Sequence, residues 1–105
     1  MSTCSTHVLD AALGRPAAGI AVLLTSVEAA LAEAVTDADG RVRFETDLSP
    51  GDYRLTFATG PWFSAQQRKT FYPGVTLHFT VEPGQDHYHV ALLLSPFSYT
   101  TYRGS

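Results

Sequence analysis

The sequence predicts an all-β protein, an antiparallel β-sandwich of seven to eight short strands with one short helix. Three observations predict this fold: closely spaced turn signals, runs of strand length between them, and apolar side chains at alternate positions within several runs. The turn signals are rich in Gly, Pro and Asp, and they fall at residues 14–16, 39–40, 49–52, 60–61, 72–74, 83–86 and 95–96. Many short strands with frequent turns are typical of a β-sandwich. A chain of 105 residues is expected to form one domain, residues 1–105.

Period-two alternation predicts the half-buried strands. Residues 52–57 and 75–81 carry apolar side chains at every second position. Successive side chains of a strand point to opposite faces, so the apolar set of each segment should face the core. The short run Thr6–Asp10 follows the same rule, which places Val8 inward and His7 outward.

The remaining strands are predicted from apolar runs and turns. Residues 20–24 and 90–94 are continuous apolar runs, which suit strands that are covered on both faces. Asp39-Gly40 is a strong hairpin turn, and it would present Arg41 at the first position of the next strand. Residues 98–101 are predicted to form a final strand.

Two segments have helical character. Residues 26–35 are rich in Ala, Leu and Glu, which favours a helix, but no Gly or Pro bounds the segment and a hairpin turn follows it. The pattern alone therefore leaves strand and helix open for residues 26–35. Residues 62–69 follow Gly60-Pro61 and are predicted to form the one short helix, because proline suits a first helical turn.

Composition excludes some classes of function. The formal net charge is −3, and the seven Lys and Arg residues are scattered along the chain. Nucleic-acid binding needs a clustered basic patch, so no nucleic-acid partner is expected. The single cysteine, Cys4, excludes an intrachain disulfide framework and is expected to be a small core residue.

The sequence also gives expectations about the membrane and the compartment. No Lys or Arg precedes His7, and no apolar stretch near the N-terminus has the length of a signal peptide. The longest apolar stretch, residues 17–24, is far too short to span a membrane. A cytoplasmic protein without a membrane partner is therefore expected.

His87 and His89 are the first candidates for chemistry. They lie two positions apart, so on a strand both imidazoles point from one face, while Tyr88 and Val90 point to the core. Two such imidazoles suit metal ligation or acid–base catalysis. The spacing does not separate these roles from that of surface or structural histidines, and both readings stay open.

Arg41 and His7 are further candidates. An arginine held rigidly by a turn suits a planar, electron-rich carbonyl compound or an anion, although a single exposed arginine is commonly only a surface charge. His7, at a strand start, is by itself more typical of a structural histidine. His7, His87 and His89 raise the question of zinc, but imidazole spacing is permissive evidence, and no metal is expected.

The C-terminal tetrapeptide Tyr102-Arg103-Gly104-Ser105 combines an aromatic ring, a guanidinium, a glycine and a hydroxyl. Chain ends commonly fray and carry no chemistry. Because the tail directly follows the predicted strand 98–101, that strand would hold it in place if it joins a sheet. The alternative is a solvated end without a role.

Several motifs together resemble the 5-hydroxyisourate hydrolases, the transthyretin-related enzymes of urate breakdown. The motifs are Ser5-Thr6-His7-Val8-Leu9-Asp10, Gly14-Arg15-Pro16-Ala17, Asp39-Gly40-Arg41, Gly51-Asp52-Tyr53, Phe71-Tyr72-Pro73, His87-Tyr88-His89-Val90 with the following Leu92-Leu93-Leu94-Ser95-Pro96, and Tyr102-Arg103-Gly104-Ser105. The resemblance covers essentially the whole chain in order, and the terminal tetrapeptide is its most specific part. The chain departs from the family at Ala91, where proline is usual, and in residues 25–36, which are shorter than usual.

The resemblance implies a transthyretin-like β-sandwich, with strands in residues 26–35, and hydrolysis of 5-hydroxyisourate without a cofactor. It implies a homotetramer, a dimer of dimers, with the active site in a channel where the two dimers meet. The catalytic residues it implies are His7, Arg41, His89 and Ser105. The substrate-binding residues it implies are His7, Arg41, Tyr102, Arg103 and Gly104.

The alternative reading is a transthyretin-like carrier that binds a small ligand without catalysis. Transthyretin keeps the scaffold motifs of this family but has no counterpart of His7, Arg41, His89 or the terminal tetrapeptide. The presence of all four in this chain favours the enzyme, because an apolar ligand pocket has no use for so many polar groups.

Overall fold

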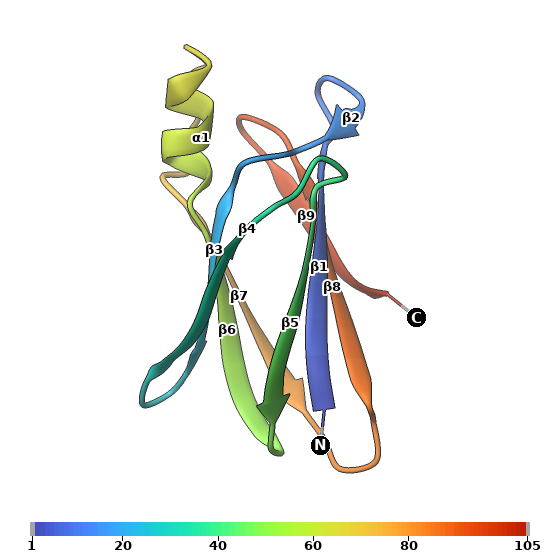
Figure 1. Cartoon of the computed structure of the whole chain (residues 1–105). Helices are drawn as coiled ribbons and strands as arrows, with labels where there is room; N and C mark the ends of the chain where they lie inside the picture. Colours follow the sequence, from blue (N-terminus) through green and yellow to red (C-terminus); the bar gives the residue numbers. More distant parts are fainter. Residues whose placement is uncertain (1, 105) are drawn as a thin grey trace.

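A computed structural model describes residues 2–104, which form two β-sheets packed face to face and one short helix at one end (Figure 1). The elements are β1 (Ser2–Asp10), β2 (Arg15–Pro16), β3 (Ala21–Ser26), β4 (Ala30–Val35), β5 (Arg41–Leu48), β6 (Gly51–Phe57), α1 (Thr59–Ala65), β7 (Val75–Val81), β8 (His87–Leu94) and β9 (Tyr99–Gly104). The predicted all-β sandwich with one short helix is confirmed. The nine described strands include the two-residue β2, which the sequence pattern did not separate.

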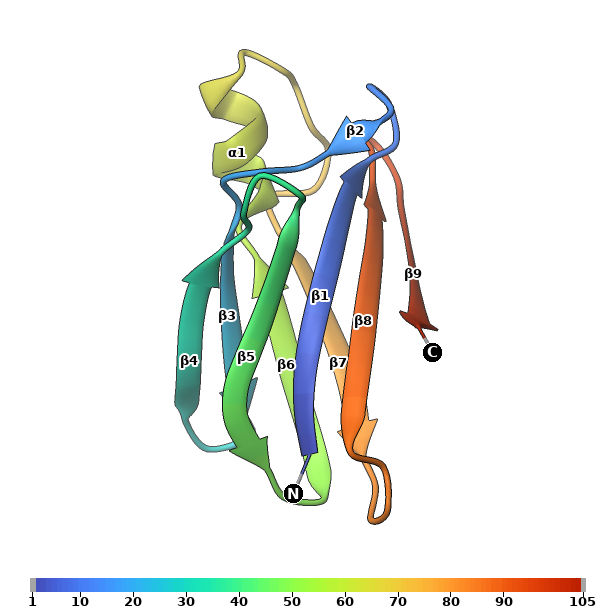
Figure 2. The ribbon, with the colours of Figure 1, turned by 45° about the vertical axis from the view of Figure 1, so that its right-hand side comes forward.

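The first sheet has the order β2-β1-β8-β9, with β5 also paired to β1, and the second has the order β4-β3-β6-β7. Figure 2 shows the two layers, with β5, β1 and β8 in front of β6 and β7 and with β9 beside β8. The strand pairs in the described residues are antiparallel except for β1 with β8, which is parallel. This topology puts β1 between β5 and β8, and it makes neighbours of segments from both halves of the sequence.

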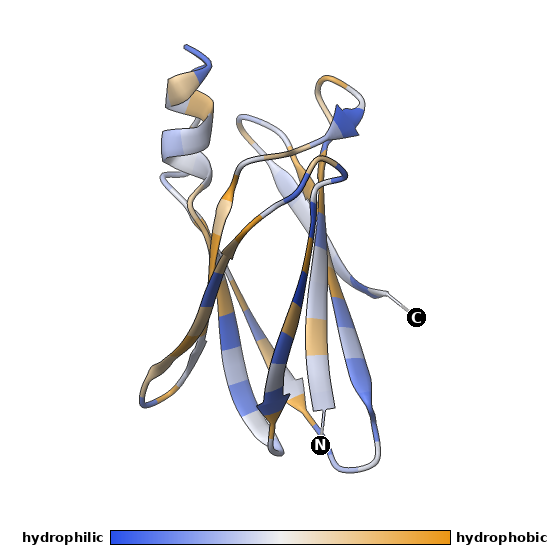
Figure 3. Ribbon diagram, viewed as in Figure 1, coloured by the Kyte–Doolittle hydropathy of each residue, from blue (hydrophilic) through white to orange (hydrophobic). Residues whose placement is uncertain are grey.

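Alternate side chains fill the space between the sheets. Along β1 and β6 the buried positions recur every second residue, and Val8, Leu55 and Phe57 are completely buried. The same alternation is visible along β5 as hydrophilic and hydrophobic bands in Figure 3. Cys4 is also completely buried, as predicted, and burial raises the pKa of its thiol to about 11.

The expectation that residues 20–24 and 90–94 are covered on both faces was wrong in part. Ala21 is exposed, and Leu23 and Leu93 are only half-buried. Each of these side chains points away from the opposite sheet, so within one chain nothing covers them fully. Ala91 is the exception on the outer face of β8, since it is almost completely buried.

The segment 26–35, which the pattern left open, forms a turn followed by the edge strand β4. The Ser26 hydroxyl oxygen accepts hydrogen bonds from the backbone N–H groups of Glu28 and Ala29 at 3.2 and 3.1 Å, which shapes the turn. β4 then pairs with β3 from Ala30 to Val35. Cross-strand pairing therefore outweighs the helical propensity of the Ala-rich run, as tertiary context commonly does.

The predicted helix is present but displaced along the chain. It was expected at residues 62–69, and α1 spans Thr59–Ala65, with Pro61 in its first turn as expected. The helix ends where Gln67 adopts a positive φ of 57°. Within the described residues no helix is long and apolar enough to cross a membrane.

Candidate active site

The first sheet brings His7, Arg41 and His89 onto three neighbouring strands. His7 on β1 lies opposite Arg41 on β5, and Ser5, two residues before His7, lies beside His89 on β8. The even spacing of Ser5 and His7 puts both side chains on the same face. That face is the outer one, because Thr6 and Val8, which alternate with Ser5 and His7 along β1 and point to the other face, are completely buried. The predicted outward direction of His7 and His89 is confirmed.

A tight turn aims Arg41. The carboxylate of Asp37 accepts hydrogen bonds from the backbone N–H groups of Asp39 and Arg41, both at 2.9 Å. Gly40 between them has a φ of +76°, and a Cβ there would lie 2.3 Å from the carbonyl oxygen of Val8. Only glycine fits both the backbone conformation and this close approach. Arg41 therefore starts β5 from a fixed position, as the sequence predicted.

Hydrogen bonds join the two histidines of β8 to β1. The hydroxyl of Ser5 lies 2.8 Å from Nδ1 of His89 and 2.8 Å from Nε2 of His87. The hydroxyl of Thr3 lies 2.7 Å from Nδ1 of His87. These contacts form one continuous chain, Thr3–His87–Ser5–His89, along the outer face. Such a chain holds both imidazole rings in defined orientations.

The surroundings of His89 disfavour its protonation. Burial lowers the pKa of His89 from its ordinary value of 6.5, and Arg41, His7 and His87 lower it further through their charges. For His87, burial also lowers the pKa, and the nearby Arg43 acts in the same direction while Glu45 opposes it. His89 is therefore neutral at neutral pH, which is the form that can accept a proton.

The described part of the C-terminal tail is held in the sheet. β9 pairs antiparallel with β8, beside which it lies in Figure 1, and the register of this pair puts Gly104 opposite His89. A Cβ at position 104 would lie 2.5 Å from Cδ2 of His89, so glycine allows the backbone to contact the imidazole ring. Ser105, a predicted catalytic residue, lies outside the described residues.

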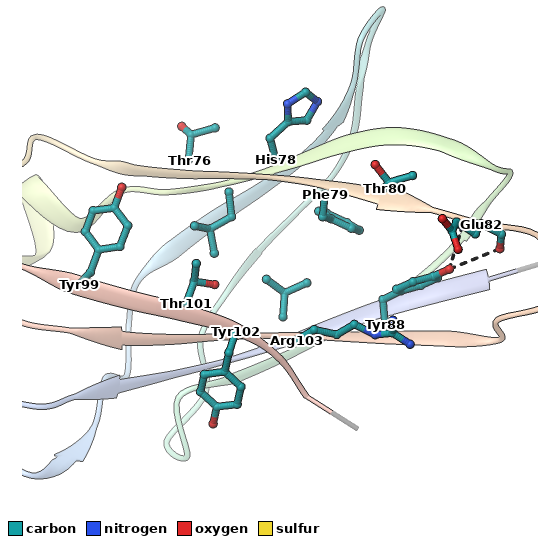
Figure 4. A pocket seen from close by; sticks show the side chains of 12 residues that line it. Thr76, His78, Phe79, Thr80, Glu82, Tyr88, Tyr99, Thr101, Tyr102 and Arg103 are labelled. Atoms are coloured by element: carbon teal, nitrogen blue, oxygen red, sulfur yellow. Dashed lines mark hydrogen bonds between the residues drawn. The ribbon is translucent and has the colours of Figure 1, made fainter.

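The structure divides the other tail residues between the two faces of the sheet. Tyr102 lies opposite Ala91, and so belongs to the outer face with His89, whereas Arg103 lies opposite the core residue Val90. The guanidinium of Arg103 lies over the ring of Tyr88, 5.4 Å from its centre. Figure 4 shows Tyr102 pointing away from the side on which Arg103 extends toward Tyr88. The structure therefore does not bring Arg103 together with His7, Arg41 and His89.

A hollow of about 310 Å³ lies on the outer face next to Arg41 and His89. Its lining residues are Ser5, Thr6, Asp37, Arg41, Val42, Arg43 and His89. A larger cavity of about 500 Å³ lies between β7 and β9, and it is the one drawn in Figure 4. The smaller hollow is the better candidate for catalysis, because the predicted catalytic residues Arg41 and His89 line it, although His7 does not.

The three histidines do not form a cluster with other metal-binding side chains in the described residues. Between residues 2 and 104, no group of three or more His, Cys, Asp or Glu side chains is placed to hold a metal ion. The hydrogen bonds of His87 and His89 go to hydroxyl groups of Thr3 and Ser5 instead. This arrangement can accept a proton, bind an anion or a carbonyl oxygen, and orient a water molecule.

Sequence reasoning missed the part that Ser5 and Thr3 play in the site. The available signal was the spacing of Thr3, Ser5 and His7, which puts three polar side chains on the face opposite the apolar ones. The partners of these residues are 82 to 84 positions away in the chain. Only the parallel register of β1 with β8 brings them together.

Comparisons with known proteins agree with this geometry. Residues 4–104 match the family described as HIUase/Transthyretin. A 5-hydroxyisourate hydrolase of Caulobacter vibrioides is 44% identical over 115 residues, with all of both chains covered. The structure of Klebsiella pneumoniae 5-hydroxyisourate hydrolase superposes with a TM-score of 0.92 and is 40% identical, covering 100% of this chain and 94% of the other. Transthyretin from Sparus aurata superposes with a TM-score of 0.88 at 34% identity, covering 96% of this chain and 95% of the other.

Proposed function

The chain belongs to the HIUase/transthyretin family, and on this premise we propose that it is a 5-hydroxyisourate hydrolase. It converts 5-hydroxyisourate to 2-oxo-4-hydroxy-4-carboxy-5-ureidoimidazoline in the breakdown of urate. The observation that carries this proposal is the convergence of His7, Arg41 and His89 on the outer face of one sheet. A polar site of two imidazoles and a guanidinium suits hydrolysis better than the carriage of an apolar ligand.

The reaction is the addition of water to a ring carbonyl of a cyclic amide. The water oxygen bonds to the carbonyl carbon, the carbon–nitrogen bond breaks, and the ring nitrogen takes up a proton. This chemistry needs a base for the water, a positive group for the developing oxyanion, and a clamp for the substrate. His7, Arg41 and His89, which lie on one face of the sheet, are our candidates for these roles.

We assign the roles as follows. One of the two imidazoles, His7 or His89, takes the proton from water, and the other orients the water or returns the proton. Arg41 binds the substrate oxygens through its fork of donors and stabilises negative charge that develops on them. Ser105, with its hydroxyl and adjacent carboxylate, positions the water or a histidine.

Tyr102 and Gly104 supply further contacts to the substrate from β9, since both residues are on the outer face. Arg103 is left out of these contacts, because it lies on the opposite face over Tyr88. No step of this mechanism requires a cofactor or a metal ion.

We further propose that the protein works as a homotetramer, a dimer of dimers, which covers the outer face. Two features support assembly. β7 and β9 are edge strands of the two sheets, and an edge strand can pair with another chain. Leu13, Phe71 and Phe97 are large apolar side chains that are exposed in the single chain.

The buried, free Cys4 is compatible with a cytoplasmic location, which we also propose.

The decisive experiment is an assay with 5-hydroxyisourate generated by urate oxidase. The purified protein should accelerate its decay and yield one optically active product. Decay at the spontaneous rate, with a small ligand bound instead, would favour the transthyretin-like carrier.

Replacing His7 or Arg41 with Ala, or deleting Ser105, should lower turnover while the oligomer stays intact. Loss of assembly with unchanged activity per oligomer would show these residues to be structural.

A further inference from the structure

We propose that Ser5 and His87 are positioning residues, which hold His89 in the tautomer with Nδ1 protonated and the Nε2 lone pair open to the reacting water. This inference rests on the proposed function and decides a point that it leaves open, namely which nitrogen of which histidine acts as the base. It starts from the hydrogen-bonded chain Thr3–His87–Ser5–His89 on the outer face.

Two arrangements of protons use the Ser5 hydroxyl as a link between the two histidines. The Ser5 hydroxyl has a single proton, and it lies 2.8 Å from a ring nitrogen on each side. In both arrangements it donates to one neutral histidine and accepts an N–H from the other. In the first arrangement Ser5 donates to Nδ1 of His89, and the proton of His89 is on Nε2. In the second, Nδ1–H of His89 donates to Ser5, Ser5 donates to Nε2 of His87, and Nδ1–H of His87 donates to Thr3.

The surroundings of the ring favour the second arrangement. Ser5 occupies the Nδ1 side of His89, and the Gly104 backbone lies close to Cδ2, which leaves Nε2 as the ring nitrogen that is not bonded to Ser5. Arg41 lines the same hollow as His89. A cation beside the ring favours a lone pair, rather than an N–H group, on Nε2. Nδ1 of His89 is then the donor, and the chain ends with a hydroxyl acceptor at Thr3.

The second arrangement also suits a base during catalysis. When Nε2 accepts a proton, Nδ1–H still donates to the Ser5 oxygen, so the imidazolium keeps a hydrogen-bond acceptor. A group that orients a catalytic imidazole in this way fixes both its tautomer and its direction. Ser5 and His87 act through His89 and need no contact with the substrate.

Nitrogen NMR of histidine-labelled protein tests the tautomer directly. At a pH well above the pKa of His89, wild-type protein should show a protonated Nδ1 and an unprotonated Nε2 for this residue. Ser5→Ala should shift the population toward Nε2–H, and Ser5→Thr, which keeps the hydroxyl, should restore the wild-type signal. A wild-type His89 protonated on Nε2 would overturn the proposal.

Kinetics supply the second readout. Ser5→Ala should lower kcat by about tenfold to a hundredfold with little change in KM. This loss in kcat is a part of the rate enhancement that a general base contributes. Ser5→Thr should recover most of the loss. The matched control is Thr56→Ala, since it removes a half-buried hydroxyl with a cross-strand hydrogen-bond partner, Thr76, from the outer face of the other sheet. Thr56→Ala should leave kcat unchanged.

A double-mutant cycle tests whether His87 acts through Ser5. His87→Phe keeps a ring but removes both hydrogen bonds, and it should lower kcat less than Ser5→Ala does. The double variant should be no slower than Ser5→Ala alone, because residues in one chain are not additive. Fully additive losses, or a Ser5→Ala variant with wild-type kcat, would overturn the proposal.

These outcomes are distinguishable from a failure of the proposed function. If wild-type protein does not accelerate the decay of 5-hydroxyisourate, the proposed function fails, and the NMR experiment still reports the tautomer. If wild-type protein is active and the Ser5 variants change neither kcat nor tautomer, only the positioning role is lost.

Discussion

At the scale of single residues, the charge around His89 sets its chemistry. Burial lowers the pKa of His89 first, and Arg41 is the largest of the charges that lower it further. The charges that act on this ring come from Arg41 on β5, His7 on β1 and His87 on β8 itself, and the carboxylate of Asp37 lines the same hollow. Burial and the nearby Arg41 guanidinium together keep the His89 imidazole available as a base at neutral pH.

This electrostatic argument predicts the effect of Arg41→Gln. The substitution removes the positive charge, so the pKa of His89 should rise toward its ordinary value of 6.5. A histidine NMR titration measures the pKa without relying on activity, which Arg41→Gln also lowers through substrate binding. The control is Arg54→Gln on the other sheet, which should leave the titration of His89 unchanged. An unchanged or lower pKa in Arg41→Gln would contradict the argument.

The candidate site could be predicted in part from the sequence. His7, Arg41 and His89 were found because their motifs match a family and because alternation predicts an outward direction. The bridge through Ser5 could not be found in this way, because it depends on the register of β1 with β8 across a separation of 84 residues. The separation of Tyr102 and Arg103 onto opposite faces was in principle accessible, since adjacent residues of a strand alternate.

At the scale of elements, local patterns predicted the existence of most strands and of the helix better than the limits of these elements. Residues 26–35 have helical propensity, yet pairing with β3 makes a strand of residues 30–35. The limits of α1 depend on contacts that are distant in sequence. A Cβ at Gly60 would lie 2.4 Å from the carbonyl oxygen of Pro73, so the start of α1 packs against the segment that leads to β7.

The segment after α1 is attached to the end of β1 by an ion pair. Nη1 of Arg68 lies 2.8 Å from the carboxylate of Asp10, which is only 1% exposed. The same guanidinium lies over the ring of Phe63, 4.8 Å from its centre. Burial alone raises the pKa of Asp10, but hydrogen bonds from Arg68 and from backbone N–H groups outweigh it, so the pKa lies below its ordinary value of 3.8.

Arg68→Met should therefore destabilise the fold. It leaves the buried Asp10 carboxylate without its cation, which costs about 3 kcal/mol in free energy of unfolding near neutral pH. A carboxyl group with a lowered pKa stabilises the fold above its unfolded pKa, and this contribution disappears as pH falls below 3.8. The difference between wild type and variant should thus shrink in acid. Denaturant unfolding at a series of pH values measures it.

The matched control for this prediction is Arg43→Met. Arg43 pairs with Glu45 at 3.3 Å, but both side chains are largely exposed. Exposed ion pairs contribute about 0–1 kcal/mol, so this variant should lose little stability. Equal losses in the two variants would show that the attachment of the segment to β1 does not depend on the Asp10 carboxylate.

At the scale of the whole molecule, the single chain leaves its candidate site open on the outer face of a sheet. The apolar residues Leu13 and Phe97 are exposed near one end of that sheet. Backbone hydrogen bonds hold the neighbouring loops together there, from Ala11 to Leu94 and from Phe71 to Pro96. The sequence predicted a tetramer only through the family resemblance, because exposure of a side chain cannot be read from a one-chain pattern.

If the proposed tetramer covers this end of the sheet, Phe97→Asp should weaken it. Phe97 is 61% exposed in the single chain, and burying an aspartate in its place would cost about 2 kcal/mol or more of association free energy. Sedimentation velocity should show smaller oligomers, and the rate of 5-hydroxyisourate decay per subunit should fall because the site loses its cover. Val27→Asp is the control, since Val27 is 68% exposed in the turn between β3 and β4, at the other end of the molecule. A tetramer that survives Phe97→Asp would show that this end of the sheet is not part of the interface. Smaller oligomers with full activity per subunit would place the active site entirely within one chain.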